Sequence, residues 1–341
     1  MICSSTGEPI DSGRRRFIGA TVAIAAAAEL GMPPIAFAQS RDASFGRVRQ
    51  VEAGALSIGY VETGARDVPA VILLHGWPYD IHSYAEVAQI LAAGGFRVIV
   101  PFLRGYGSTR FLDDAAPRNG QQVALAMDVL ALMDALRIPS AIIGGYDWGA
   151  RTADIVAAVF PTRCTALVSV SGYLIGSQAA NRRPLSPSAE LAWWYQYYFA
   201  TERGWAGYAA NTSDFARLIW RMASPRWMFD DATFTRSAPA FNNPDHVAIV
   251  IHNYRWRLGL AEGEPQYDAM EEALAAAPPI SVPTITMEGD ANGAPHPRPE
   301  DYAAKFTGRY EHRTVSGGIG HNLPQEAPQA FAQAVVDLSR R

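Results

Sequence analysis

Short apolar runs, separated by segments with helical spacing, are the main pattern along this chain. The continuous run Val71-Ile72-Leu73-Leu74 is typical of a strand buried on both faces. In the segment 120–136, apolar residues recur with the spacing of one helix face. The predicted strands are 48–51, 56–62, 71–74, 96–101, 141–143, 166–170, 283–287 and 311–315, and the predicted core helices are 85–93, 120–136 and 150–160. Strands that alternate with helices in this way predict an α/β fold with a doubly wound, mainly parallel sheet.

This alternation breaks between residues 172 and 283. Six of the eight tryptophans lie there, with many tyrosines and phenylalanines. Helical segments are expected at 188–203, 211–223 and 244–260. We therefore predict an aromatic-rich helical cap, 172–283, inserted between two late strands of a core formed by 39–171 and 284–341. Such a cap would close an apolar site that has a few polar groups.

Composition and charge restrict the possible partners. With 49% hydrophobic and 18% charged residues, the 341-residue chain can build a large core. The net charge is −4 and no basic stripe is visible, so we expect no nucleic-acid partner.

The N-terminal segment has the pattern of a targeting signal. Arg14-Arg15-Arg16-Phe17-Ile18 precedes a weakly apolar, alanine-rich run, and Ala36-Phe37-Ala38 supplies a small-x-small cleavage pattern. This resembles a twin-arginine export signal, with cleavage after Ala38 and a periplasmic or secreted product. The apolar run is too short and too interrupted to predict a membrane span.

The candidate chemistry centres on Gly145-x-Asp147-x-Gly149, between a predicted strand and a predicted helix. Small residues on both sides of one reactive side chain are typical of a sharp strand-to-helix turn that strains the central residue. A carboxylate there gains nothing against a carboxylic ester, but it can attack a saturated carbon that carries a leaving group, forming an alkyl ester. Epoxides and alkyl halides are then the expected substrates, and a serine-type esterase is disfavoured. The ordinary alternative is a solvated aspartate in a glycine-rich turn.

Two further segments complete this chemistry. His75-Gly76-Trp77-Pro78 follows the strand at 71–74, where the backbone N–H groups of Trp77 and Trp148 would form an oxyanion hole. The abrupt turn makes Trp77–Pro78 a candidate cis bond. After the last strand, a glycine-rich loop presents His321, the expected base that activates water against the ester.

At this point the chain resembles the epoxide hydrolase and haloalkane dehalogenase branch of the α/β-hydrolase fold, over residues 45–340. The segment Asp147-Trp148-Gly149 fits both halves of that branch, and His75-Gly76-aromatic-Pro78 is closer to epoxide hydrolases. The resemblance implies two cap tyrosines that donate hydrogen bonds to the epoxide oxygen, Tyr195 and Tyr254. It also implies a substrate pocket, with His75, Pro78, Trp194 and Arg151 as its candidate residues here.

The chain departs from the family pattern at the acid that orients the histidine. The expected position, three residues after Gly289, holds Asn292, and Asp290 is the nearest acid. We favour Asp290 as the orienting residue, with Asn292 as the alternative. Arg151 matches a carboxylate-binding arginine of fluoroacetate dehalogenases, but we favour an ordinary salt bridge on its helix.

The sequence thus predicts a hydrolase that opens small apolar epoxides to vicinal diols through an ester on Asp147, which a water activated by His321 hydrolyses. It requires no metal and no organic cofactor, because the carboxylate and the histidine suffice. One alternative is a hydrolytic haloalkane or haloacid dehalogenase, in which the Trp148 indole N–H and a cap donor would hold the halide. Another is a non-catalytic protein that binds small molecules, for which Asn292 is the best support.

Overall fold

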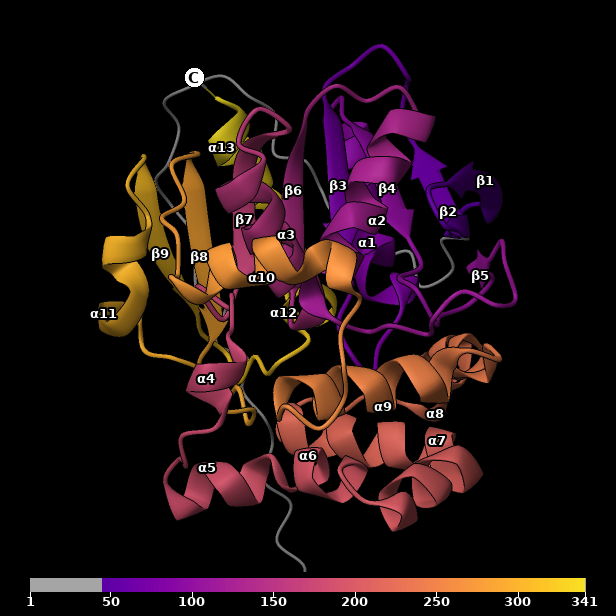
Figure 1. The fold of residues 1–341 in the computed structure, drawn as a ribbon. Coiled ribbons are helices and arrows are strands. Elements are labelled where there is room, and N and C mark those ends of the chain that lie inside the picture. Colours follow the sequence, from indigo (N-terminus) through magenta and orange to yellow (C-terminus); the bar gives the residue numbers. More distant parts are fainter. Residues whose placement is uncertain (1–44, 341) are drawn as a thin grey trace, which may run out of the picture. The chain divides into compact units, whose positions relative to one another are not determined.

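A mixed β-sheet forms the centre of the computed structural model, which describes residues 45–340 (Figure 1). Its strands run in the order β1-β2-β4-β3-β6-β7-β8-β9, and β5 pairs with β2. The strands are β1 (Arg49–Ala53), β2 (Leu56–Thr63), β3 (Ala70–Leu74), β4 (Arg97–Pro101), β5 (Arg110–Phe111), β6 (Ala141–Tyr146), β7 (Cys164–Val170), β8 (Thr284–Gly289) and β9 (Tyr310–Val315). The pairs from β4 to β9 are parallel, and β1 and β2 are antiparallel to their neighbours. The predicted mainly parallel α/β fold is confirmed.

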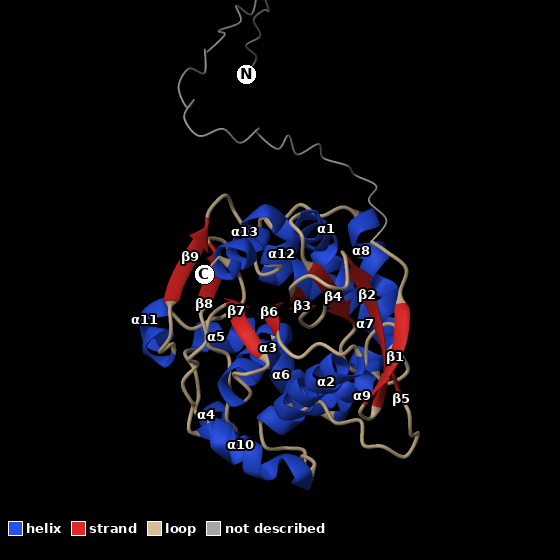
Figure 2. Ribbon diagram, turned by 90° about the horizontal axis from the view of Figure 1, so that it is seen from above, coloured by secondary structure: helices blue, strands red, loops and turns tan. Residues whose placement is uncertain are grey.

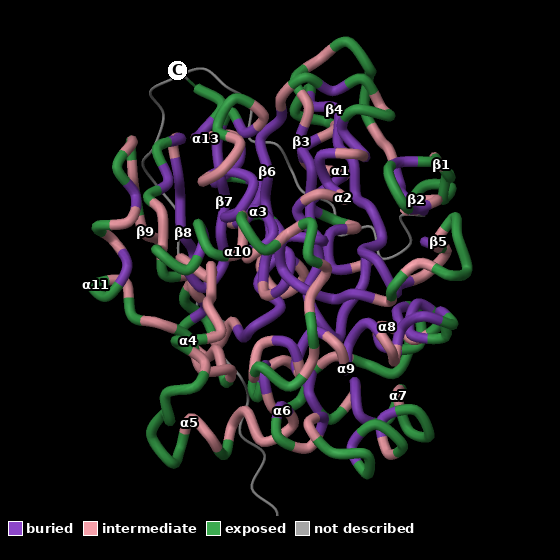
Figure 3. Tube along the Cα trace, in the orientation of Figure 1, coloured by how far each residue is buried: buried purple, intermediate pink, exposed green. Residues whose placement is uncertain are grey.

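Helices cover both faces of this sheet. Seen from above, α1, α12 and α13 lie on one face, and α2 and α3 lie on the other (Figure 2). The helices of the core are α1 (Ala85–Ala93), α2 (Gln122–Ala135), α3 (Trp148–Val159), α11 (Pro299–Tyr302), α12 (Leu323–Glu326) and α13 (Pro328–Ser339). Because β6 is covered on both sides, all of its residues are buried, as are those of β4, and the other central strands are mostly buried (Figure 3).

The segment between β7 and β8, called the insertion below, is helical. It contains α4 (Gln178–Asn181), α5 (Pro187–Ala192), α6 (Trp194–Phe199), α7 (Glu202–Ala223), α8 (Asp231–Ser237), α9 (His246–Arg257) and α10 (Asp268–Ala275). The predicted single helix at 188–203 is wrong, because Trp193 and Ala200–Thr201 interrupt it. The Thr201 side chain caps the N-terminus of α7 by accepting from the Gly204 N–H, so a new helix begins there.

Several helices were not predicted from the sequence. The N-terminus of α8 is capped by Asp230, whose side chain accepts from the Thr233 N–H. The C-terminal helix α13 carries Pro328 in its first turn. Proline is common at the start of a helix, but the spacing of apolar residues does not detect this signal. Within residues 45–340, no helix is long and apolar enough to cross a membrane. The predicted export signal at 1–38 lies outside the described residues.

Aromatic side chains of the insertion pack on the turn that follows β3. The Trp77 ring lies 5.0 Å from Tyr195 and 5.2 Å from Tyr254 between ring centroids. Trp148, at the start of α3, lies 6.0 Å from Tyr254 in the same way. The insertion thus contacts the core at the carboxyl ends of β3 and β6, where ligands bind in open α/β sheets.

Candidate active site

Asp147 occupies a strained turn between β6 and α3. Its φ of 54° and ψ of −121° lie in a region that residues other than glycine rarely adopt. The neighbouring backbones leave no room for side chains: a Cβ on Gly149 would lie 1.9 Å from the Leu74 carbonyl oxygen, and one on Gly76 would lie 2.5 Å from the Asp147 Cβ. The small residues predicted around the reactive side chain are therefore required by close contacts.

Both carboxylate oxygens of Asp147 have defined partners. The Trp77 N–H donates to Oδ1 at 2.7 Å, and the His321 Nε2 lies 3.6 Å from Oδ2. Burial pushes the pKa of Asp147 upward, but the nearby His321 ring, the charge of Arg151 and the Trp77 N–H together bring it below its ordinary value. Asp147 is therefore ionised at neutral pH, and with 22% of its side chain exposed it is not a freely solvated turn residue.

The turn after β3 is fixed by His75. The His75 Nδ1 donates to the Gly76 carbonyl, and its Nε2 accepts from the Leu103 N–H at 3.1 Å. Burial lowers the pKa of His75 to about 4, so the ring stays neutral and keeps this arrangement. His75 thus holds the turn through backbone groups, which use both of its ring nitrogens. The predicted cis bond between Trp77 and Pro78 is confirmed.

Hydrogen bonds to Glu326 and Ser224 fix the loop that carries His321. Glu326 accepts hydrogen bonds from the Gly320 N–H and the Asn322 N–H, and the Ser224 hydroxyl donates to it at 2.6 Å. The same hydroxyl accepts from the His321 N–H at 2.9 Å. The backbone on both sides of His321 is thereby fixed, which aims the Nε2 at Asp147.

The structure does not bring Asp290 or Asn292 to the imidazole. Asp290 is exposed, and its carboxylate accepts from the backbone N–H groups of Gly317, Gly318 and Ile319. Asn292 donates to Glu288 at 2.7 Å. Within residues 45–340, the His321 Nδ1 has no hydrogen-bond partner. Glu326, five residues further along the chain, instead accepts hydrogen bonds from the backbone N–H groups on both sides of His321.

Tyr195 and Tyr254 lie side by side on the insertion, 5.5 Å apart between ring centroids. Burial, and then the charge of Asp147, raise the pKa of Tyr195; burial also raises the pKa of Tyr254. Both phenols therefore keep their protons at neutral pH and act as hydrogen-bond donors. The charge of Arg257 opposes the rise in pKa at both phenols, and the charge of Arg151 also opposes it at Tyr195.

The other predicted residues are placed around this cluster. Trp194 packs on Tyr195 and Phe215, and the Pro78 carbonyl accepts from the Trp220 indole N–H at 2.7 Å. Trp148 begins α3, so the helix does not use its backbone N–H. The interpretation of Arg151 as one half of a helix salt bridge is wrong, because no described carboxylate lies within 4.0 Å of it. Its Nε donates to the Leu174 carbonyl.

Comparison with known proteins agrees with this arrangement. The family model described as "alpha/beta hydrolase fold" matches residues 69–231. A crystal structure of a candidate epoxide hydrolase from Klebsiella pneumoniae is 64% identical, with a TM-score of 0.86, and the match covers 86% of this chain and 98% of that one. The chain belongs to the α/β-hydrolase family.

Curated relatives of this α/β-hydrolase are epoxide hydrolases. The enzyme of Caballeronia sordidicola is 27% identical over 84% of this chain and 91% of its own length. Epoxide hydrolase B of Mycobacterium tuberculosis is 36% identical, but the match spans only 41% of that protein and 40% of this chain. The match to epoxide hydrolase B is therefore confined to one part of each protein.

Sequence reasoning missed four residues of this α/β-hydrolase that act on the site. Ser224 and Glu326 hold the His321 loop, Asp154 is a buried residue of α3, and Arg257 lies one helical turn after Tyr254 on α9. Two of them had a sequence signal: Glu326 is the acid nearest to His321 along the chain, and Arg257 has the i, i+3 spacing of one helix face.

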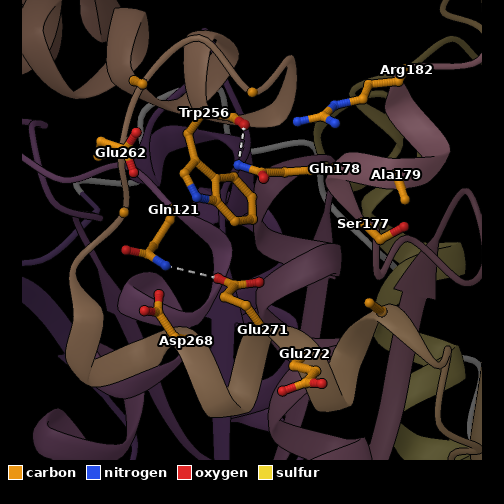
Figure 4. Close-up of a pocket in the computed structure, with 14 residues that line it drawn as sticks. Gln121, Ser177, Gln178, Ala179, Arg182, Trp256, Glu262, Asp268, Glu271 and Glu272 are labelled. Carbon is orange, nitrogen blue, oxygen red and sulfur yellow. Dashed lines mark hydrogen bonds between the residues drawn. The ribbon is translucent and has the colours of Figure 1, made fainter.

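A cavity of about 460 Å³ lies apart from the Asp147 cluster of the α/β-hydrolase (Figure 4). Its lining combines acidic and neutral polar residues with Arg182, Trp256 and several small residues, and includes neither Asp147 nor His321. The Glu271 carboxylate, drawn in its lower part, accepts from the side chains of Gln121 and Gln122 and from the Val123 N–H. These bonds join α10 to the start of α2, so Glu271 has a structural role.

Replacing Glu326 with glutamine is expected to lower the kcat of this α/β-hydrolase on the order of 10–100-fold, because a charged hydrogen-bond partner of the His321 loop is lost. KM should change little, since Glu326 has no contact with Asp147 or the tyrosines. Steady-state kinetics measure both constants. Glu300→Gln, a change of an exposed acid, is the matched control. Equal losses in kcat for both variants would contradict a positioning role for Glu326.

Asp154 gives the α/β-hydrolase a pH-dependent stability. It is completely buried, and burial raises its pKa from 3.8 to about 8 although Oδ2 accepts from the Leu174 N–H. Between pH 4 and pH 8 the carboxyl group of Asp154 is therefore protonated in the folded protein but ionised in the unfolded chain. Its contribution to the free energy of unfolding is full below pH 4 and is lost as the pH rises to about 8.

Asp154→Asn removes this loss while keeping the acceptor for Leu174. We expect the variant to be more stable than wild type at pH 8, on the order of 2–4 kcal/mol, with a much smaller gain at pH 5. Urea unfolding at the two pH values measures the difference. Asp134→Asn, on the surface of α2, should show no such pH-dependent gain. A gain of the same size at both pH values would show that Asp154 is ionised in the fold.

Proposed function

We propose that this protein hydrolyses epoxides to vicinal diols through an alkyl-enzyme ester on Asp147. The observation that carries the proposal is the pairing of an ionised carboxylate in a strained turn with a histidine Nε2 at 3.6 Å, next to two tyrosines that pack on Trp77 and Trp148. The similarity to epoxide hydrolases over most of the chain supports it. In this reading the insertion is a cap over the reacting atoms.

In the first step, the Asp147 carboxylate attacks one carbon of the oxirane. A carbon–oxygen bond to the enzyme forms, the bond from that carbon to the epoxide oxygen breaks, and a phenol of Tyr195 or Tyr254 gives its proton to the alkoxide. The Trp77 N–H, which donates to Oδ1, leaves Oδ2 as the attacking oxygen.

In the second step, His321 takes a proton from water and the resulting hydroxide attacks the carboxyl carbon of Asp147. The oxyanion forms where Trp77 already donates, with the unused Trp148 N–H at the start of α3 as the second donor. The imidazolium then protonates the leaving alkoxide. Ionisation of the regenerated carboxylic acid returns a proton to the tyrosine, so the balance is one epoxide and one water for one diol.

The proposal is tested by supplying the purified protein with styrene oxide and, separately, with 1-bromobutane. Diol formation without bromide release is the expected result. A single turnover in ¹⁸O-labelled water should place the label on Asp147, detected by mass spectrometry of the peptide, because water attacks the carboxyl carbon. Label found only in the diol would indicate direct attack of water on the epoxide. Binding of a range of epoxides and halides without turnover would instead favour a non-catalytic binding protein.

A hydrolytic dehalogenase is the second candidate, favoured by one observation. The Trp148 indole Nε1 is buried beside the nucleophile and has no hydrogen-bond partner among the described residues. Such an N–H could hold a departing halide. Trp148→Phe should then abolish bromide release, whereas it should leave epoxide opening within a few-fold of wild type if the tyrosines stabilise the leaving oxygen.

We also propose export through the twin-arginine pathway, on the pattern of residues 12–38 alone. Changing both Arg14 and Arg15 to lysine keeps the charge but removes the arginine pair, and should retain the precursor inside the cell. Immunoblots of periplasmic and cytoplasmic fractions measure this. Equal distribution of the two forms would contradict the proposal.

A further inference from the structure

Trp77 connects the nucleophile with both tyrosines of the site. Its backbone N–H donates to the Asp147 Oδ1, and its ring packs on Tyr195 at 5.0 Å and on Tyr254 at 5.2 Å between centroids. The residue is buried, and Nε1 is the one polar atom of its side chain. A shift of this ring would move the surface on which the two phenols pack. The partner of Nε1 therefore bears on the geometry of the reaction.

A chain of three buried hydrogen bonds begins at this atom. The Trp77 Nε1–H donates to the Tyr208 hydroxyl at 2.9 Å, and that hydroxyl lies 2.8 Å from the His246 Nε2. On the other side of the imidazole, the His246 Nδ1 lies 2.9 Å from the Gly105 carbonyl oxygen. Tyr208 and His246 are both completely buried. The polar atoms of three buried side chains thus satisfy one another.

The direction of each bond follows from the chemistry of the two ends of this chain. An indole N–H can only donate, and a carbonyl oxygen can only accept. The Tyr208 oxygen therefore accepts from Trp77 and gives its own proton to the His246 Nε2, while the proton of the imidazole lies on Nδ1 and faces Gly105. Burial lowers the pKa of His246 to about 4, so the ring is neutral at pH 7, as this arrangement requires.

The hydrogen-bond chain starts in the core, crosses the insertion and returns to the core. Tyr208 lies on α7 and His246 is the first residue of α9, two helices that lie next to each other in the insertion (Figure 1). Trp77 and Gly105 lie in the loops that follow the neighbouring strands β3 and β4. Gly105 has a φ of 78°, and a Cβ there would lie 3.0 Å from the Ile249 Cβ, so α9 packs directly on this loop.

Aromatic packing reinforces the same connection. Tyr106 lies edge-on to His246 and to His75, at 4.7 Å between ring centroids in each case. His75 in turn fixes the loop that carries Trp77, through its bond to the Gly76 carbonyl. Both ends of the hydrogen-bond chain are therefore linked a second time through Tyr106.

We propose that Tyr208 and His246 are positioning residues that hold the Trp77 indole and, through it, the two phenols of the site. This inference rests on the proposed epoxide hydrolysis. It assigns the chain to the first step, in which a phenol must reach the epoxide oxygen as Asp147 attacks, because a displaced donor delivers its proton poorly. The second step uses the backbone N–H of Trp77, which the backbone bonds of its own turn hold in place.

Single-turnover mixing with styrene oxide, followed by mass spectrometry of the quenched protein, measures the formation and the decay of the Asp147 ester separately. Tyr208→Phe and His246→Asn each break the chain and should slow ester formation about tenfold, the effect of one lost buried hydrogen bond, while changing its decay less than about threefold. His246→Gln keeps an acceptor near the position of Nε2 and should recover most of the rate. Tyr173→Phe removes a hydroxyl that donates to the Pro278 carbonyl at 2.8 Å, and should leave both steps unchanged.

A double variant shows whether Trp77 transmits the effect. In Trp77→Phe the indole N–H is gone, so the addition of Tyr208→Phe should slow ester formation no further. A further loss as large as in wild type would show that Tyr208 acts elsewhere, and would overturn the inference. An unchanged rate in Tyr208→Phe, an equal loss in Tyr173→Phe, equal slowing of both steps, or equal rates for His246→Gln and His246→Asn would each do the same.

A second measurement is independent of turnover. The indole N–H signal of Trp77 in the ¹H–¹⁵N NMR spectrum is identified by its loss in Trp77→Phe. Tyr208→Phe should shift this signal and speed its exchange with solvent deuterium at least about tenfold, whereas Tyr173→Phe should do neither. If no epoxide forms an ester but the signal responds in this way, the hold on Trp77 stands and the proposed reaction falls. If the ester forms and the signal does not respond, the inference is overturned and the epoxide hydrolase survives.

Discussion

Replacing Asp147 with asparagine is expected to abolish turnover of epoxides and of alkyl halides, lowering kcat at least about 10⁴-fold. Asparagine has nearly the same size and keeps an oxygen that accepts from the Trp77 N–H, so the turn should persist. The amide lacks the negative charge and the nucleophilicity that both reactions need. Diol and bromide assays measure the loss, and the near-ultraviolet circular dichroism spectrum shows whether the fold is retained.

Asp134→Asn is the matched control, because it removes a carboxylate from the surface of α2 and should keep full activity. The pH profile of wild type provides a second check. The pKa of Asp147 is held below its ordinary value, so the nucleophile stays charged down to low pH and its protonation should not limit the rate at pH 6–8. If Asp147→Asn retained more than a few per cent of turnover, another group would be the nucleophile.

The sequence predicted the nucleophile turn well because its requirements are local. Strand, small residue, aspartate, small residue and helix follow one another in the chain, and the close contacts at Gly76 and Gly149 involve segments that the same motifs identify. The alternation of strands and helices likewise gave the sheet and its mainly parallel character, since parallel strands need crossover helices.

The environment of His321 could not be derived in the same way. The family pattern directs attention to residues after β8, but in this chain Asp290 turns outward to hold the glycine loop. The acid that acts on His321 is Glu326 in α12, through a hydroxyl supplied by Ser224 at the end of α7. Such a network depends on how the insertion meets the core, and no spacing along the chain specifies that contact.

The insertion shows the second limit. Its aromatic residues predict helices and a packed apolar surface, but the rings occur on every side of 193–199 and give no clear helical face. The boundary between α6 and α7 is set by the Thr201 cap and by the packing of Phe199 against Tyr208 and Phe215. Arg151 shows the same limit. An arginine four residues after an aspartate has the spacing of a salt bridge on one helix, and only the positions of the surrounding acids show that no such bridge forms.

Replacing His321 with glutamine is expected to stop the second step and leave the first one working. Glutamine fills the space and offers hydrogen bonds, but it cannot take a proton from water. The loss of a general base costs on the order of 10²–10⁴-fold in kcat. Styrene oxide should then give one equivalent of stable ester on Asp147 per protein molecule. Intact-protein mass spectrometry measures the adduct, and peptide mapping locates it.

The rate of this first step should also depend on pH in a defined way. The nearby His321 ring lowers the pKa of Asp147, so its removal allows burial to raise that pKa. Adduct formation in His321→Gln should therefore speed up as the pH rises through the new, higher pKa, whereas the wild-type first step stays flat. An adduct that forms at a rate independent of pH would show that the His321 ring does not control the charge of Asp147, despite the 3.6 Å that separate them. Sustained diol production by the variant, with no adduct, would mean that water attacks the epoxide directly and that no ester is formed.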